Sequence, residues 1–258
     1  MRQTEVRSVN DIRAAVGEAE WAARVDLAAC YRLVALYGMT DLIYNHISAQ
    51  VPGHDDQYLI NPYGMLYEEI TASSLVKIDL SGNKVDDSPW DVNPAGFTIH
   101  SAIHAARADA NCVIHTHSMN GTAVSAQEHG VLPLTQHASF ILASLGYHDY
   151  EGVALLDDEK PRLVRDLGDN RYLMLRNHGL LTVGRTVGEA FVAMYMLEAA
   201  CAMQLRALSG GTALRPIDVA TLATAGDNWD RVTRGIGGEI AWPALLRKLD
   251  RISPGYRD

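Results

Sequence analysis

Short strand-like segments alternate with helical segments along most of this 258-residue chain, and this alternation constrains the fold more than any other feature. Strand-like segments end at turn residues, whereas helical segments carry apolar residues at helical spacing. The alternation predicts a globular protein of the α/β class, built as one large domain or two small ones. The sequence contains neither the GxGxxG motif nor a P-loop, so it gives no support to a nucleotide-binding fold.

The expected elements follow one another between Glu18 and Ile252. Helical spacing predicts helices over residues 18–37, 95–109, 121–130, 186–211 and 241–252. Strand patterns cover residues 42–51, 57–64, 74–85, 112–117 and 171–184, and the segments 74–85 and 171–184 each read as strand, turn and strand. Residues 1–16 are expected to form a loose N-terminal arm, and the tail from residue 212 is less regular.

Composition argues against several classes of function. The net charge of −9 and the isoelectric point near 5.5 argue against a nucleic-acid-binding surface, which is usually basic, and against docking on an anionic membrane. The first residues lack the apolar stretch of a signal peptide. The sequence has no run of about 18 apolar residues, so no transmembrane helix is expected. Cys30, Cys112 and Cys201 form no CxxC motif and are expected to be reduced, mostly buried thiols. These features predict a cytoplasmic protein that binds neither nucleic acid nor membrane.

A pair of histidines lies within the apolar strand pattern CVIHTHS, residues 112–118. Alternate residues of a strand face the same side, so the rings of His115 and His117 point together. Thr116 should point to the opposite face, where an apolar neighbour or a helix is expected. Two imidazole nitrogens so placed can bind one zinc ion at about 2.0–2.1 Å. The same pair could instead be exposed or simply hydrogen-bonded, and the pattern leaves both alternatives open.

A third histidine, His178 in RNHGLL, is expected at a strand end, before a glycine that permits an unusual backbone conformation. A loop histidine positioned by a rigid strand is a common ligand, although a solvated turn histidine fits the same pattern. Three neutral imidazoles that leave a fourth position open are typical of catalytic metal sites. His100 and His104 share one face of the expected helix, but HSAIH lacks the glutamate of HExxH. We therefore expect these two rings to serve packing or to support a site.

Several ordered motifs together resemble one family. The segment AGFTIHSAIHAARADANCVIHTHSMNGTAVSA followed by RNHGLLTVG is similar to the class II aldolase/adducin family, and so are LYGMTDLIYNHISAQVPG and LINPYGMLYEEITASSLVKIDLSGN. The resemblance covers about residues 20–210, and the tail WPALLRKLDRISPGY resembles that of adducin-like bacterial members. The central stretch is more similar to the adducin head domain than to the sugar-phosphate aldolases.

The resemblance implies a single-domain α/β/α sandwich with a central, mostly antiparallel sheet. Residues 17–211 would form this domain, and residues 212–258 would be a C-terminal extension that packs on the same domain or on a neighbouring subunit. Family members are typically homotetramers with sites at subunit interfaces. Their metal is usually zinc, and the ligands that the resemblance implies here are His115, His117 and His178.

The sequence departs from the sugar-phosphate aldolases at positions that carry their chemistry. Where those enzymes place a carboxylate or similar group as acid/base, this chain has Gly96, and the nearby Asp91 is a candidate substitute. The phosphate-binding pairs fall on Asn45–His46, Tyr63–Gly64 and Pro94–Ala95, which lack most of the small donors that a phosphate needs. Candidate contacts to a substrate that is not a sugar phosphate are Asn45, His46, Tyr63 and Gly64.

A Lewis-acidic metal could chelate a small 2-keto or 2-hydroxy acid, polarise its carbonyl group and stabilise an enediolate. The matching reactions, retro-aldol cleavage and decarboxylation, need a group that transfers a proton. The candidates are His137 in TQHASF and Tyr147 in LGYHDYEG. His137 roughly matches a segment that supplies a catalytic tyrosine from the neighbouring subunit in the aldolases, and packing at a subunit interface is an equal alternative. For Tyr147 a structural role is favoured.

The sequence therefore predicts a metal-dependent lyase that acts on a small, non-phosphorylated keto or hydroxy acid as a homo-oligomer. Zinc is the expected metal, with Fe(II) or Mn as alternatives. A non-haem Fe(II) oxygenase ranks second, because three imidazoles with open positions also suit iron. A non-catalytic adducin-like binding or scaffold protein ranks third, because adducin is expected to bind partners largely through tail regions that this chain lacks.

Overall fold

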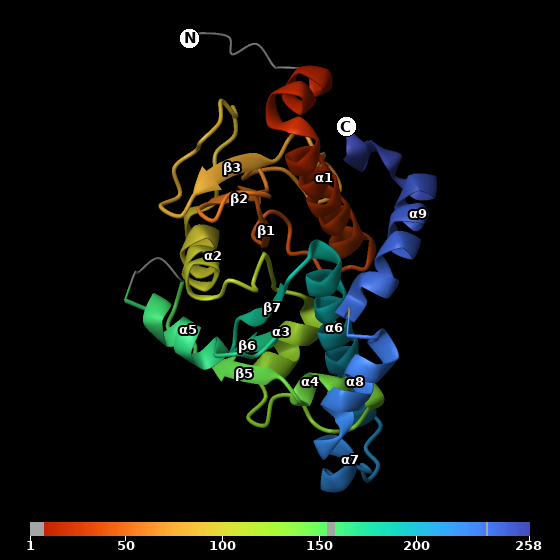
Figure 1. The fold of residues 1–258 in the computed structure, drawn as a ribbon. Helices are drawn as coiled ribbons and strands as arrows, with labels where there is room; N and C mark the ends of the chain where they lie inside the picture. Colours follow the sequence, from red (N-terminus) through yellow and green to blue (C-terminus); the bar gives the residue numbers. More distant parts are fainter. Residues whose placement is uncertain (1–7, 154–157, 236) are drawn as a thin grey trace.

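A computed structural model describes residues 8–153, 158–235 and 237–258, and a mixed sheet runs through the middle of the molecule (Figure 1). Within these residues the sheet has seven strands in the order β3–β2–β1–β4–β7–β6–β5. The strands are β1 His46–Gln50, β2 Gln57–Ile60, β3 Val76–Asp79, β4 Cys112–Thr116, β5 Leu145–His148, β6 Tyr172–Leu175 and β7 Gly179–Gly184. Every neighbouring pair is antiparallel except β5 and β6, which are parallel. The expected α/β class and mostly antiparallel sheet are confirmed.

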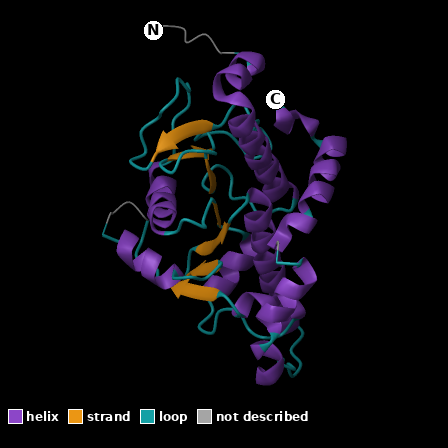
Figure 2. Cartoon of the chain, in the orientation of Figure 1, coloured by secondary structure: helices purple, strands orange, loops and turns teal. Residues whose placement is uncertain are grey.

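Helices cover both faces of this sheet (Figure 2). Contacts with the strands place α2 and α5 on one face and α1, α3 and α6 on the other. The helices are α1 Val9–Leu36, α2 Pro94–Ala106, α3 Met119–Ser125, α4 Gln136–Leu142, α5 Lys160–Leu167, α6 Val187–Ser209, α7 Val219–Ala223, α8 Ala225–Thr233 and α9 Trp242–Ile252. One hydrophobic cluster lies between the sheet and α1 and α6, and a smaller one lies under α2 and α5. The layers are those of the α/β/α sandwich that the resemblance implies.

The central strand β4 separates the two hydrophobic clusters. Its residues are all buried, and Cys112 and Ile114 pack in the cluster under α1 and α6. Thr116 follows them on the same face, where its hydroxyl donates a hydrogen bond to Sδ of Met194 in α6 over 3.4 Å. The expectation that Thr116 meets a helix is therefore confirmed. Because side chains alternate along a strand, His115 turns to the opposite face, toward α2.

The N-terminal helix begins earlier than the sequence predicts. α1 starts after Ser8, whose hydroxyl accepts a hydrogen bond from the backbone N–H of Asp11 and so caps the helix. The helix is interrupted at Gly17, which has φ 77° and ψ 169°. Residues 9–16, expected as part of a loose arm, are therefore helical up to this kink. Residues 1–7 of the expected arm lie outside the described residues.

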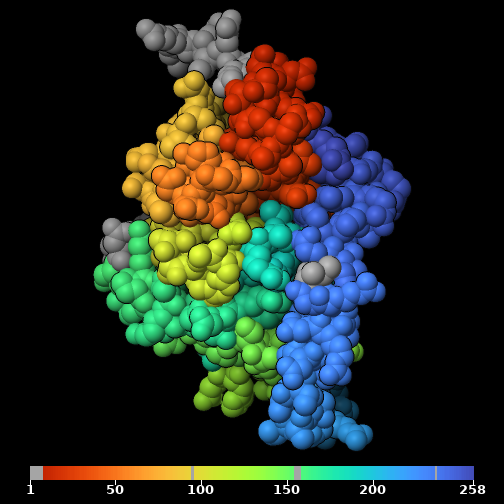
Figure 3. All heavy atoms as spheres, in the orientation of Figure 1, coloured from red at the N-terminus to blue at the C-terminus, as the bar shows by residue number. Residues whose placement is uncertain are grey.

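The C-terminal extension packs on its own chain. It runs along one side of the molecule beside the N-terminal helix, blue against red in Figure 3. Nε1–H of Trp242 donates a hydrogen bond to the carboxylate of Asp26 in α1 over 3.1 Å. The carbonyl oxygen of Tyr256 accepts a hydrogen bond from the backbone N–H of Ala72 over 3.0 Å. The described part of the extension therefore contacts its own domain, and contact of residues 212–258 with a neighbouring subunit stays a prediction.

The long apolar helix α6 lies in the core. It is the one described helix that is long and apolar enough to span a membrane. Its contacts are nevertheless those of a core helix, since it packs on β7, β4, α3 and α1. The carboxylate of Glu198 accepts hydrogen bonds from the Ser118 hydroxyl and the Gly121 backbone N–H. Burial within the sandwich therefore accounts for the apolar composition of α6.

Candidate metal centre

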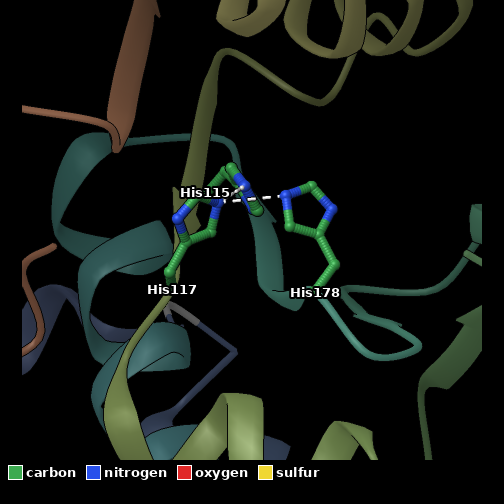
Figure 4. Close-up of side chains that lie close together, drawn as sticks. All are labelled: His115, His117 and His178. Atoms are coloured by element: carbon green, nitrogen blue, oxygen red, sulfur yellow. Dashed lines mark hydrogen bonds between the residues drawn. The ribbon is translucent and has the colours of Figure 1, made fainter. Parts of the chain in front are cut away.

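Three histidines from two segments meet at one end of the sheet (Figure 4). His115 belongs to β4, His117 follows that strand, and His178 lies in the turn between β6 and β7. Nε2 of His117 lies 3.0 Å from Nε2 of His115 and 3.0 Å from Nε2 of His178. One ligand atom from each of the three residues lies within 4.8 Å of the others. The folded chain thus brings together the three histidines that the sequence singled out.

The turn that carries His178 depends on both of its neighbours. Asn177 has a left-handed backbone with φ 55°, a conformation that asparagine tolerates better than most residues. The His178 N–H donates to the carbonyl oxygen of Leu175 over 3.1 Å and closes the turn. At Gly179 a β-carbon would lie 2.4 Å from the carbonyl oxygen of Thr116. The expectation that Gly179 supplies the unusual conformation is therefore wrong: Asn177 makes the turn, and Gly179 lets β7 approach β4.

Hydrogen bonds on the outer nitrogens orient two of the rings. Nδ1–H of His115 donates to the carbonyl oxygen of Leu180 over 3.0 Å. Nδ1–H of His117 donates to a carboxylate oxygen of Asp41, also over 3.0 Å. A carbonyl or carboxylate oxygen only accepts, so the proton of each neutral ring is on Nδ1 and the lone pair is on Nε2. Partners of this kind are characteristic of metal-binding histidines.

Burial favours the neutral, metal-binding form of His115 and His178. Burial, and next the neighbouring His178, hold the pKa of His115 well below its usual value. Burial, and next His117, lower the pKa of His178 to about 4. The facing Nε2 lone pairs of His115 and His117 repel each other unless a cation lies between them. Tetrahedral zinc ligands lie about 3.3 Å apart, close to the 3.0 Å seen here, so the donor set fits a divalent metal.

A cavity of about 410 Å³ opens beside the three histidines. Its other walls come from β1, from Ile99 of α2 and from loops that carry tyrosines. These lining residues include Asp41, Tyr44, His46, Tyr63, Asn93 and Tyr150. No lysine or arginine occurs among the described residues that line it. The size suits a small organic molecule bound next to the metal ligands.

The four candidate substrate contacts take different positions around this cavity. His46 and Tyr63 line it, whereas Gly64 follows Tyr63 with a left-handed φ of 104°. Asn45 is buried, and its Oδ1 accepts a hydrogen bond from the backbone N–H of Asp41 over 2.7 Å. Its Nδ2 is a buried donor without a partner among the described residues. Asn45 thus holds the backbone of Asp41, whose carboxylate orients His117.

The space next to Gly96 is filled by a histidine. A β-carbon at position 96 would lie 2.4 Å from Cδ2 and 2.8 Å from Nε2 of His46. Asp91 is the candidate to replace the acid/base group that is missing at Gly96. Its side chain is 91% exposed, and its Oδ1 lies 3.9 Å from Nζ of Lys84. The carboxylate of Asp91 therefore faces solvent, and the group that occupies the region of Gly96 is an imidazole.

The two candidates for proton transfer, His137 and Tyr147, do not line the cavity of their own chain within its described part. His137 lies in the first turn of α4. The hydroxyl of Tyr147 accepts a hydrogen bond from the backbone N–H of Val131 over 3.1 Å, and the Arg176 guanidinium lies 4.2 Å from the centre of its ring. A role for either residue in catalysis would require the cavity of a neighbouring subunit and stays a prediction.

Sequence reasoning missed several residues that the fold brings to the site. Asp41 and Tyr150 are the clearest cases, because both lie in segments quoted above, LYGMTDLIYNHISAQVPG and LGYHDYEG, but neither was singled out as a site residue. The Tyr150 ring lies 6.1 Å from that of His178, measured between centres. A carboxylate that supports a metal-binding histidine is a general feature of metal sites, but the Asp41 contact joins positions far apart in the chain.

The family model described as Class II Aldolase and Adducin N-terminal domain matches residues 25–205 of this chain. A Pseudomonas aeruginosa protein, named as a candidate aldolase class 2 protein, is 57% identical over 250 residues, which cover 96% of each chain. Alpha-adducin of Rattus norvegicus is 41% identical over 272 residues, which cover 98% of this chain and 36% of adducin. The crystal structure of an aldolase II superfamily protein from Pseudomonas syringae is 48% identical with a TM-score of 0.92, covering 96% of this chain and 100% of that one. This chain belongs to the class II aldolase and adducin family.

Proposed function

We propose that this protein is a metal-dependent lyase that cleaves a carbon–carbon bond in a small, non-phosphorylated keto or hydroxy acid. The observation that carries the proposal is the convergence of the Nε2 atoms of His115, His117 and His178 on the wall of one cavity. Membership of the class II aldolase and adducin family supports it. A metal site that opens onto a cavity can bind a substrate, whereas a structural site is closed by its protein ligands.

The three histidines would hold one divalent cation, with Asp41 and the Leu180 carbonyl fixing two of the rings. Zinc is the metal we propose, and Fe(II) or Mn would fit the same nitrogen donors. A bound cation would supply Lewis acidity toward the carbonyl or hydroxyl oxygen of the substrate. The chain itself orients that substrate, because the cavity wall surrounds one side of the metal centre.

The charge of the cavity wall supports a substrate without phosphate. A phosphate dianion needs several N–H and O–H donors and usually a cationic side chain. The described lining has no lysine or arginine, and Asp41 adds a carboxylate. The hydroxyls of Tyr44, Tyr63 and Tyr150 are sufficient for the weaker demands of a small carboxylic acid or its carbonyl group.

Further parts of the proposal concern the assembled protein. We propose that it is a cytoplasmic homotetramer, and that His137 or Tyr147 of a neighbouring subunit supplies the proton that the reaction needs. Asn45 and Gly64 would shape the substrate side of the cavity through their neighbours, and His46 and Tyr63 would touch the substrate directly.

The relationship to alpha-adducin favours one other function, a non-catalytic binding or scaffold role. The similarity extends over 98% of this chain, so the adducin head and this protein share most of a domain. In that case the cavity would bind no substrate that the protein turns over.

An anaerobic assay with zinc-loaded protein separates these functions. We expect a member of a panel of 2-keto and 2-hydroxy acids to be cleaved, with the carbonyl product or carbon dioxide released. The His115→Ala/His117→Ala variant should lose this turnover, whereas His54→Ala/His129→Ala, at two exposed turn positions, should keep it. Turnover seen only in a parallel aerobic assay of Fe(II)-loaded protein would instead indicate an oxygenase, and no turnover in either assay would favour the scaffold role.

A further inference from the structure

A buried chain of hydrogen bonds joins the cavity to the loop after α2. Nδ1 of His46 lies 2.8 Å from Nε2 of His100, and Nδ1 of His100 lies 2.5 Å from Oγ of Ser48. The same hydroxyl lies 2.6 Å from Nε2 of His104, and Nδ1 of His104 lies 2.7 Å from the carbonyl oxygen of Ala110. The three rings and the hydroxyl are all buried, so water does not compete for these contacts.

The carbonyl group at the end of the chain fixes the direction of every hydrogen bond. Because this oxygen only accepts, Nδ1 of His104 carries a proton, and Nε2 of the neutral ring accepts from the Ser48 hydroxyl. Ser48 has one proton, so its oxygen accepts from Nδ1–H of His100. Nε2 of His100 then accepts from Nδ1–H of His46. The last ring, His46, is left with its lone pair on Nε2.

The opposite direction would require an extra proton in the chain. If Nε2 of His46 carried a proton, each bond would reverse, and His104 would need protons on both nitrogens to serve Ser48 and Ala110 together. A buried imidazolium with two neutral partners is costly, and burial lowers the pKa of His104 to about 4. The geometry therefore supports the form in which His46, His100 and His104 are all neutral and carry their proton on Nδ1.

The free nitrogen of His46 belongs to a ring that the fold holds in place. The Cδ2–Nε2 edge of the ring faces Gly96 of α2, which has no β-carbon to cover it, and the centre of the ring lies 5.0 Å from the centre of the His115 ring. His46 lines the cavity, and no described residue forms a hydrogen bond with its Nε2. Among the described residues, the hydrogen-bond partner of the His46 ring is thus His100, through Nδ1.

We propose that Nε2 of His46 accepts a hydrogen bond from the hydroxyl group of a bound hydroxy acid. The hydrogen bonds through His100, Ser48 and His104 hold the His46 proton on Nδ1 and so leave Nε2 free to accept. The contact with the substrate rests on the proposed function, whereas the direction of the hydrogen bonds from His46 to Ala110 does not. His46 then selects substrates that carry a hydrogen-bond donor beside the metal-bound group. His100, Ser48 and His104 act as positioning residues, since they reach the substrate only through His46.

The first test measures the protonated nitrogen directly. In zinc-loaded protein labelled with ¹⁵N-histidine, long-range ¹H–¹⁵N correlation spectra distinguish a ring protonated on Nδ1 from one protonated on Nε2. We expect His46, His100 and His104 to carry the proton on Nδ1, with the His46 signals assigned from a His46→Phe spectrum. A proton on Nε2 of His46 overturns the proposal, whatever the protein catalyses.

The second test compares two acids that differ only in the donor. Calorimetry on zinc-loaded protein would measure the Kd of glycolate and of methoxyacetate, its O-methyl ether. We expect wild type to prefer glycolate by about three- to tenfold, as one hydrogen bond would give. Ser48→Ala breaks the chain without touching the cavity and should remove most of this preference. Ser125→Ala deletes another buried hydroxyl, one that bonds to the Thr122 carbonyl, and should keep it.

The two tests separate the failure of this inference from that of the proposed function. Equal binding of the two acids by wild type contradicts the contact with His46, even where the spectra show the expected protonation. An unchanged preference in Ser48→Ala contradicts the positioning role of the chain. If neither acid binds, the proposed substrate class and the contact with His46 both fail, and the spectra still decide whether the chain has the proposed order.

Discussion

The His46 imidazole occupies the space into which a side chain at Gly96 would project, since a β-carbon there would lie 2.4 Å from Cδ2 of the ring. The ring has little freedom to move away, because its Nδ1 donates to His100 inside the buried chain. Residue 96 is therefore a glycine for a steric reason. An acidic side chain could not be introduced at this position without displacing His46.

Gly96→Ala should lower the free energy of unfolding by about 1–3 kcal/mol, the usual cost of overpacking a buried site. Thermal unfolding would measure the loss. The matched control is Gly226→Ala in α8, where the new β-carbon would meet Ala143 at an ordinary 3.6 Å. Combining Gly96→Ala with His46→Ala removes the obstacle, so the double variant should lose less than the sum of the two single changes. Additive losses would contradict the steric account.

Asp41→Ala should weaken zinc binding by about 10- to 100-fold, because it removes the carboxylate that accepts the Nδ1 proton of His117. Competition with a chromophoric chelator would measure the affinity. Asp41→Asn keeps an accepting oxygen and should lose less. Asp91→Asn, at an exposed carboxylate, serves as the control for the change of charge. The same affinity in all four proteins would show that Asp41 does not support the ligand.

Stability should fall as the pH drops from about 6.5 to about 4, because the buried His104 stays neutral in the folded protein while the unfolded chain takes up a proton. With a folded pKa of about 4 and an ordinary value of 6.5, His104 would cost about 2 kcal/mol at pH 5 relative to pH 8. Denaturant unfolding at the two pH values would measure this difference. His104→Gln should show a smaller loss of stability between pH 8 and pH 5 than wild type. An equal loss would contradict the claim that buried His104 stays neutral in the folded protein.

The parts of the fold that could be predicted have local signals. The pattern of residues 112–117 places His115 and His117 on one face and Thr116 on the other, and the structure agrees, because Thr116 meets α6 and the two histidine rings meet each other. The strand expected over residues 81–85 is reduced to a single bridge between Ile78 and Lys84, because a short polar turn segment lacks a partner along its length.

The elements that could not be predicted depend on distant contacts. Sequence reasoning missed α4, β5 and α5, which span 136–142, 145–148 and 160–167. β5 is a partly buried edge strand that pairs in parallel with β6, so its four residues show no alternation of apolar and polar side chains. The chain from His46 to Ala110 is equally invisible, because it joins β1 to α2 through side chains rather than through a motif.

The central claim is that His115, His117 and His178 bind one divalent metal ion, and metal analysis of purified protein tests it most directly. Protein expressed without added metal and dialysed against metal-free buffer should contain about one zinc, iron or manganese ion per chain. The folded His115→Ala/His117→Ala variant should lose this metal, and His54→Ala/His129→Ala should retain it. A wild-type protein without bound metal, or a double variant that keeps the same content, would contradict the account.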